Sequence, residues 1–165
     1  MKNRVYLSLG TNLGNRQSNL LFAIAQIEKY AGTIVSQSSV YATAPWGFES
    51  DHHFLNMALA IDTDLDPASL LIQLKQIEIE AGRITQTTLR YEDRLLDIDL
   101  LLFNDLILHT HQLEIPHPRL HLRNFVLVPL DEIAPNLIHP ALKKTINALL
   151  SVCPDTNIVH STVIG

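Results

Sequence analysis

The chain has 165 residues and a formal net charge of −5, with 47% apolar and 18% charged residues. These values are typical of one globular domain, so we expect residues 1–165 to form a single domain. The acidic balance argues against sequence-independent nucleic-acid binding, and no apolar run reaches the ~18 residues of a membrane span. The single cysteine and the first residues, "MKNRVYLSLGTNLGNR", which lack a signal-peptide pattern, predict a cytoplasmic protein.

The spacing of apolar residues predicts eight helices and strands along the chain. In chain order they are a strand over 4–10, a helix over 18–31, strands over 33–43 and 54–63, a helix over 67–82 capped by Asp66, strands over 95–103 and 125–130, and a helix over 140–151. Strands and helices alternate without repeated βαβ units. This favours an α+β fold with a mainly antiparallel central sheet flanked by helices.

Two aspartates interrupt the most apolar stretch, "RLLDIDLLLF" at 94–103. In a strand, Asp97 and Asp99 share one face, and the other face carries Leu96, Ile98, Leu100 and Leu102. Because both faces are largely apolar, we expect a central strand of the sheet. Paired carboxylates on such a strand resist desolvation, and oxygen ligands of this kind suit Mg²⁺. The alternative is a solvent-facing pair, or one that forms a salt bridge with Arg94.

Many basic residues lie in or beside two polar loops, although the chain as a whole is acidic. Residues 83–93 form the first loop and 113–124 the second, and the basic side chains concerned are Arg83, Arg90, Arg94, His117, Arg119, His121 and Arg123. Guanidinium groups match phosphate oxygens in a bidentate manner, although solvated surface charge is the usual role of arginine. If the loops converge on Asp97, the site combines metal-binding carboxylates with phosphate-binding cations, as in phosphoryl transfer.

No P-loop motif is present, and "GTNLG" at 10–14 lacks the dinucleotide-binding spacing, so we interpret it as a tight turn. Phe54 and Phe125 each begin a predicted strand, beside Asn56 and Asn124. Core packing is the ordinary role of such rings. A more specific hypothesis is a flat heterocycle stacked between them, with an asparagine amide contacting its polar edge.

Several stretches together resemble one family, the 6-hydroxymethyl-7,8-dihydropterin pyrophosphokinases of folate synthesis. The stretches are "LGTNLGNR" at 9–16, "VYATAPWG" at 40–47, "FLNMAL" at 54–59, "IEIEAGR" at 77–83, "RLLDIDLLLF" at 94–103 and "IPHPRLHLRNFVLVPLDEIAP" at 115–135. The resemblance implies a ferredoxin-like, three-layer αβα fold. It also implies transfer of diphosphate from ATP to the pterin hydroxymethyl group, with release of AMP and with two Mg²⁺ ions, and we expect a monomer.

The resemblance further implies a role for each matching residue. Asp97 and Asp99 hold the metal ions and, with Arg83 and Arg94, assist the transfer. The pterin is bound by Thr43, Ala44, Trp46, Phe54, Asn56 and Phe125, and ATP by Glu78, Arg94, Leu100, His117 and Arg123. The sequence departs from the family pattern at Trp46, Thr85, Tyr91, Glu92, Asp93 and Pro118.

Two other functions fit the same residues. One is a different metal-dependent nucleotidyl- or glycosyltransferase that uses the D-x-D pair, and the other is a nucleotide-binding regulatory module without turnover. We also expect residues 44–53 and 83–93 to be mobile without ligand and to be ordered by ATP.

Overall fold

The computed structural model describes residues 2–43, 53–85 and 95–162, without the side chains of residues 83–85. In chain order the elements are β1 (Asn3–Thr11), α1 (Arg16–Tyr30), β2 (Thr33–Gln37), β3 (Val40–Thr43), β4 (Phe54–Thr63), α2 (Pro67–Thr85), β5 (Asp97–Phe103), β6 (Leu108–His109), β7 (Glu114–Ile115), the 3₁₀ turn η1 (Leu120–Leu122), α3 (Asn124–Ile133), α4 (Ile146–Ser151) and β8 (Val159–Thr162). No helix in these ranges is both long and apolar enough to cross a bilayer.

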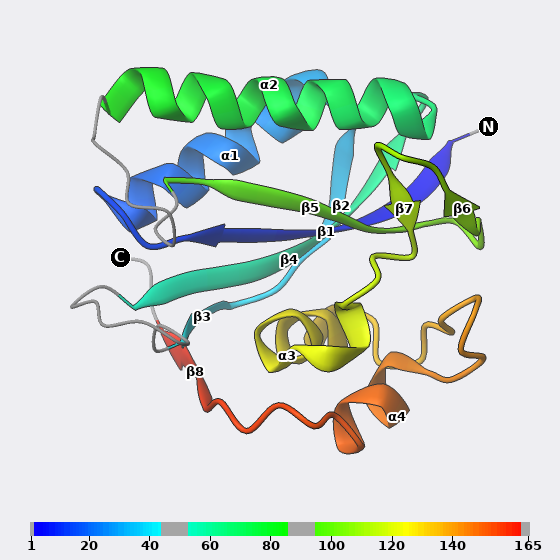
Figure 1. Cartoon of the computed structure of the whole chain (residues 1–165). Helices are drawn as coiled ribbons and strands as arrows, with labels where there is room; N and C mark the ends of the chain where they lie inside the picture. The colour runs from blue at the N-terminus through cyan, green and yellow to red at the C-terminus, as the bar shows by residue number, and fades with distance from the viewer. Residues whose placement is uncertain (1, 44–52, 86–94, 163–165) are drawn as a thin grey trace.

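The described residues form three layers (Figure 1). The middle layer is an antiparallel sheet with the strand order β5-β1-β4-β3-β8, in which β2 also pairs with β4. Helices α1 and α2 cover one face, and α3 and α4 cover the other. One buried apolar cluster fills the space on each side of the sheet. With β2 and β3 counted as one interrupted strand beside β4, the order from β1 to β5 is β-α-β-β-α-β, that of a ferredoxin-like fold, so the predicted α+β class is confirmed.

Helix α2 begins where the sequence predicts, after Asp66, whereas α1 begins at Arg16, two residues before its predicted start. Asn15 accepts a hydrogen bond from the backbone N–H of Ser18 at the start of α1 (3.0 Å), and Asp66 accepts one from that of Ser69 at the start of α2 (2.7 Å). These contacts satisfy backbone donors that have no partner within the helix. The predicted end of α2 at Gly82 is wrong, because this glycine continues the helix to Thr85.

The predicted strand over 33–43 is two strands, β2 and β3, that run along different parts of β4. Ser38 lies at the break between them. Its backbone N–H donates to the carbonyl of Ala58 (2.9 Å), and its hydroxyl oxygen accepts from the N–H of Ala58 (2.9 Å). A side chain thus replaces one rung of the backbone ladder, which a pattern of apolar residues does not reveal.

Strand β5 lies at the edge of the sheet, so the predicted central position is wrong. Its outer edge is covered by other contacts: the N–H of Ile98 donates to Glu78 (2.7 Å), and the carbonyl of Leu101 accepts from the N–H of His117 (2.9 Å). Helices cover both of its faces, and this explains its apolar composition. A register shift between Tyr6 and Leu7 of β1 moves Leu102 to the face opposite the one predicted.

Residues 125–130 lie in the helix α3, so the predicted strand there is wrong. Val126, Leu127 and Leu130 are buried at helical spacing against the sheet. The first turn is completed from outside the segment, since the N–H of Asn124 donates to the carboxylate of Asp155 (2.9 Å). The predicted helix over 140–151 is confirmed only from Ile146, after its cap at Thr145.

Candidate active site

The two aspartates lie at the start of β5 and face the layer that contains α3. Asp97 is opposite Gly10 of β1, and Gly10 is in turn opposite Asn56 of β4. One row of the sheet therefore runs from Asn56 through Gly10 to Asp97, over two strand spacings of about 4.8 Å each. The next row runs through Ser8 to Asp99. Residues far apart in sequence are thus brought together on one face.

Gly10 leaves room for the amide of Asn56. A Cβ atom at Gly10 would lie 3.0 Å from Oδ1 of Asn56, closer than nearly all real contacts of this kind. The amide also donates from Nδ2 to the hydroxyl of Thr43 (3.3 Å), and both side chains are buried. The glycine of "LGTN" therefore has a function in the site that the tight-turn interpretation missed.

Negative charge at Asp99 is poorly compensated. Burial, followed by the charges of Asp97 and Glu78, raises the pKa of Asp99 to about 7, and Arg123 and Lys75 offset only part of this. Burial also raises the pKa of Glu78, although that carboxylate accepts the hydrogen bond from Ile98. Lys75 lies 3.6 Å from Glu78, and neither aspartate forms an ion pair within the described part of the chain.

This donor set fits a hard divalent cation. Two carboxylates from one strand face offer oxygen ligands and carry charge that a cation would neutralise. Residues 2–43, 53–85 and 95–162 contain no group of three or more His, Cys, Asp or Glu side chains that could hold a metal. Asp97 and Asp99 would therefore supply two ligands, and a substrate with oxygen donors, together with water, would have to supply the others.

The proline-rich loop places its cations beside this pair. Burial and then the charge of Arg123 lower the pKa of His117, so its ring is neutral at neutral pH. Nδ1 of His117 accepts from the backbone N–H of Arg119 (3.1 Å), and this assigns the proton of the neutral ring to Nε2. The guanidinium of Arg123 lies 5.5 Å from the ring centre of Phe125. Arg123 lies close enough to influence the pKa of Asp99, and Asp97 influences the pKa of His117. Most of the first loop lies outside the described residues, so convergence of the two loops on the aspartates stays a prediction.

Two open cavities adjoin the aspartates and the aromatic residues. One, of about 260 Å³, is lined by Asp99, Leu100, His117 and Lys75 and by the backbone turn around Thr110. The other, of about 470 Å³, is lined by Arg119, Arg123, Phe125, Asp155 and neighbouring residues. Phe54 and Phe125 are both half-buried, at the ends of β4 and α3 that lie toward this region.

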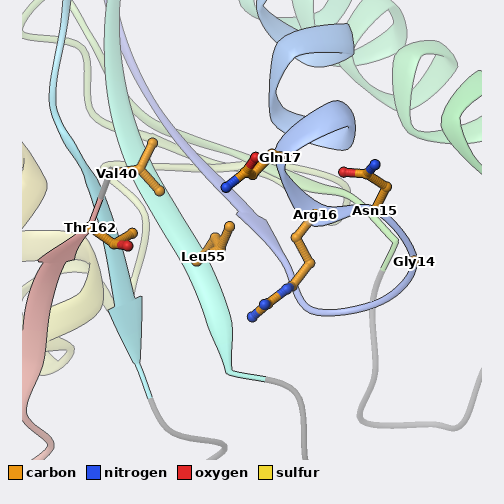
Figure 2. A pocket seen from close by; sticks show the side chains of 7 residues that line it. All are labelled: Gly14, Asn15, Arg16, Gln17, Val40, Leu55 and Thr162. Atoms are coloured by element: carbon orange, nitrogen blue, oxygen red, sulfur yellow. The ribbon is translucent and has the colours of Figure 1, made fainter. Parts of the chain in front are cut away.

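A separate cavity, of about 270 Å³, lies on the other face of the sheet (Figure 2). Gly14, Arg16 and Gln17 at the start of α1 line it, together with Val40 and Leu55, which belong to the core on the α1 side. Arg16 donates to the carbonyl of His53 (2.6 Å). This cavity contains none of the predicted site residues.

Some predicted residues lie outside the described residues. These are Ala44, Trp46, Arg90, Arg94, Tyr91, Glu92 and Asp93, with the side chains of Arg83 and Thr85. Their roles, and the ordering of residues 44–53 and 83–93 by ATP, stay predictions.

No sequence pattern predicted the hydrogen bonds that hold the chain just before β5. Thr11 donates to the carbonyl of Leu95, and Asn19 donates to the same carbonyl (3.0 Å), so a buried polar network fixes the chain just before Asp97.

Comparison with known proteins assigns a family to this geometry. The profile of the family described as 7,8-dihydro-6-hydroxymethylpterin-pyrophosphokinase (HPPK) matches residues 6–135. A 2-amino-4-hydroxy-6-hydroxymethyldihydropteridine pyrophosphokinase of Aquifex aeolicus is 43% identical over 140 residues, which are 85% of this chain and 86% of that protein. The Bacillus subtilis protein of the same name is 45% identical over 134 residues, 81% of this chain and 79% of that protein.

Longer proteins contain the same unit. The folic acid synthesis protein FOL1 of Dictyostelium discoideum is 42% identical over 159 residues, and the chain spans only 24% of its length. A crystal structure of Plasmodium falciparum HPPK-DHPS shares the fold with a TM-score of 0.72 and 19% identity, over 92% of this chain and 44% of that one. The match of 130 residues to the family profile, with relatives above 40% identity, establishes that this chain belongs to the HPPK family, the pyrophosphokinases of folate biosynthesis.

Proposed function

We propose that this chain transfers diphosphate from ATP to the hydroxymethyl group of 6-hydroxymethyl-7,8-dihydropterin, in a reaction that depends on Mg²⁺ and releases AMP. The observation that carries the proposal is the row Asn56–Gly10–Asp97, which joins an amide two residues from Phe54 on β4 to a poorly compensated carboxylate pair. A flat heterocycle at one end and a metal-bound polyphosphate at the other would lie about 10 Å apart or less along this row.

The pterin end of the proposed site combines stacking with edge contacts. Phe54 and Phe125 stack on the pterin, and the Asn56 amide, held by Thr43, contacts its polar edge. Ala44 and Trp46 complete this end in the proposal.

ATP occupies the cavity lined by Asp99, Leu100 and His117, with Glu78 behind β5. The neutral His117 ring donates from Nε2 to a phosphate oxygen, and Arg123 binds the phosphates as a cation.

Asp97 and Asp99 would hold two Mg²⁺ ions, and these ions would supply Lewis-acid stabilisation of the charge on the phosphate oxygens. Arg83 and Arg94 add positive charge there. No described side chain near the aspartates is a strong base for the pterin hydroxyl, so orientation of the two substrates contributes most of the rate. The proposal also places the protein in the cytoplasm as a monomer without nucleic-acid or membrane partners.

One assay tests the proposal. Purified protein is incubated with ATP, Mg²⁺ and 6-hydroxymethyl-7,8-dihydropterin, and the nucleotide and pterin products are separated. We expect AMP and pterin diphosphate in equal amounts, and neither product when EDTA replaces Mg²⁺. Formation of ADP would indicate transfer of a single phosphoryl group, and free pyrophosphate with AMP attached to an acceptor would indicate a nucleotidyltransferase. A nucleotide-binding module would give no product.

A further inference from the structure

A hydrogen-bonded cluster outside the proposed contacts joins the two walls of the pterin pocket. Glu132, on α3, accepts from the backbone N–H of Ser39 at both carboxylate oxygens (3.1 and 3.0 Å) and from the Ser39 hydroxyl (3.1 Å). It also accepts from the hydroxyl of Tyr41 on β3. One carboxylate thus receives four hydrogen-bond contacts from the segment that begins β3.

Both partners are held in the states that this contact requires. Burial and then the hydrogen bond to Glu132 raise the pKa of Tyr41 to about 12, so the phenol remains a donor. Burial alone would raise the pKa of Glu132, but the hydrogen bonds from Tyr41 and Ser39 outweigh it and lower this pKa. The carboxylate therefore remains an acceptor at neutral pH.

The cluster lies on the same strand and the same helix as the proposed pterin residues. Tyr41 is the direct cross-strand neighbour of Asn56, and Thr43 lies two residues further along β3 on the same face. On α3, Phe125 precedes Glu132 by seven residues, or two helical turns, so both lie on the same side of the helix. The carboxylate thus connects the strand of Thr43 to the helix of Phe125.

Within the described residues, the other contacts between α3 and the sheet are apolar, through residues such as Val126, Leu127 and Leu130. Apolar contact is not directional and permits small rotations or shifts of a helix, whereas hydrogen bonds depend steeply on distance and angle. Together with the hydrogen bonds from Asn124 to Asp155 at the other end of the helix, the cluster therefore fixes the position of α3 along β3. That position sets the distance between the ring of Phe125 and the amide of Asn56.

We propose that Tyr41 and Glu132 are positioning residues that set the width of the pterin pocket without contacting the pterin. This inference rests on the proposed function, because it assumes that the pterin binds between Phe125 and the residues of β3 and β4. Loss of the contact weakens pterin binding and has little effect on ATP.

The test compares Tyr41→Phe, Glu132→Ala and Glu132→Gln with the wild type. We expect the KM for the pterin to rise about 5- to 10-fold in the first two variants, while the KM for ATP changes less than twofold. Glu132→Gln keeps an oxygen acceptor and should recover most of the affinity. The double variant Tyr41→Phe/Glu132→Ala should be close to Glu132→Ala alone, because that change already removes the hydrogen bond that Tyr41→Phe removes.

The matched control is Asp62→Asn, which removes an ion pair with Arg4 near the opposite end of β4. It should lower the melting temperature without changing either KM. Equal changes in both KM values in the cluster variants, or a change in the pterin KM of Asp62→Asn that tracks its stability loss, would reduce the cluster to a structural role and overturn the inference.

Equilibrium binding separates this inference from the proposed function. Titration of 6-hydroxymethyl-7,8-dihydropterin is followed in the presence of Mg²⁺ and a nonhydrolysable ATP analogue. If the wild type binds and forms AMP but the variants bind equally well, the inference fails and the proposed function stands. If the wild type neither binds the pterin nor forms AMP, the proposed function fails, and the inference fails with it.

Discussion

Two carboxylate sites lie on the same face of one sheet, toward opposite ends of β1, and they differ in how their charge is compensated. Asp62 faces Arg4 directly across β4 and β1, with Oδ1 2.6 Å from Nε, and this hydrogen bond lowers the pKa of Asp62. Asp99 has no such partner in the described chain, and its pKa is raised to about 7. In the proposed function this difference has a reason: Asp62 serves the fold and is paired with its cation, whereas Asp99 leaves its charge for a bound metal to neutralise.

The largest expected effect is on enzymatic activity, and it distinguishes the Asp97–Asp99 pair from Asp62. Asp97→Asn and Asp99→Asn keep the shape of the side chain but remove the charge that binds Mg²⁺, so each should lower kcat/KM by roughly 100-fold or more. The double variant should not approach the product of the two losses, because the carboxylates act as a unit. AMP formation is measured against Mg²⁺ concentration, with Asp62→Asn as the control. Full activity of either variant at ordinary Mg²⁺ would contradict the metal role.

The next effect tests whether Phe54 and Phe125 bind a flat ring. Phe54→Ala or Phe125→Ala should weaken pterin binding about 10-fold, since stacking contributes roughly 0.5–1.5 kcal/mol beyond area burial. ATP binding should change little. Titration with each substrate and a melting curve check this, and equal loss of both affinities would return these rings to a packing role.

A smaller effect tests the row Asn56–Gly10–Asp97, which joins the proposed pterin and metal ends of the site. Gly10→Ala places a methyl group 3.0 Å from Oδ1 of Asn56 and should raise the KM for the pterin about threefold or more by displacing the amide. Gly82→Ala is the control, because a Cβ there meets nothing within 4 Å and should stabilise α2 by about 0.5–1 kcal/mol. If the two variants have the same pterin KM, the close approach at Gly10 has no role in binding.

The smallest expected effect is on stability without ligand. The raised pKa of Asp99 means that the folded state binds more protons than the unfolded state between pH 4 and 7, so this group lowers stability as the pH rises through that window. The lowered pKa of Asp62 acts in the opposite direction, and its contribution is lost as the pH falls below about 4.

Metal-free Asp99→Asn should therefore melt above the wild type at pH 7 by a few degrees, or about 1 kcal/mol, and Asp62→Asn below it. Melting temperatures across pH 4–8 with EDTA measure both slopes. A lower melting temperature for Asp99→Asn at pH 7 would show that Asp99 is compensated after all.

Local signals predicted the parts of the fold that depend on nearby residues. Alternation predicted β1 and β4, and the predicted cap at Asp66 marks the true start of α2. The failures have non-local causes. Residues 125–130 are rich in β-branched and apolar residues, but a carboxylate from Asp155 completes the helix start, and helical spacing becomes visible only when the window extends to Ile133.

The site residues divide in the same way, into those with a local sequence signal and those whose position depends on distant parts of the chain. The pair Asp97 and Asp99 stands out in any apolar strand, and Asn56 with two phenylalanines could be inferred by resemblance. Gly10 and Glu132 could not be assigned a function from sequence, because their importance comes from strand register and from a helix that the sequence analysis interpreted as a strand. Edge position is equally hidden, since coverage of β5 by Glu78 and His117 makes its composition resemble that of a central strand.

The covered edge of β5 also has a consequence for how copies of the protein meet. An exposed edge strand offers a row of free N–H and C=O groups on which another chain can add a strand, and this is a common route to aggregation. On β5, the N–H of Ile98 and the carbonyl of Leu101 are already occupied from within the chain, and the bulge near Leu101 twists the strand. The strand that bears the uncompensated carboxylates is thereby protected from pairing with a second copy, even though it lies at the margin of the sheet.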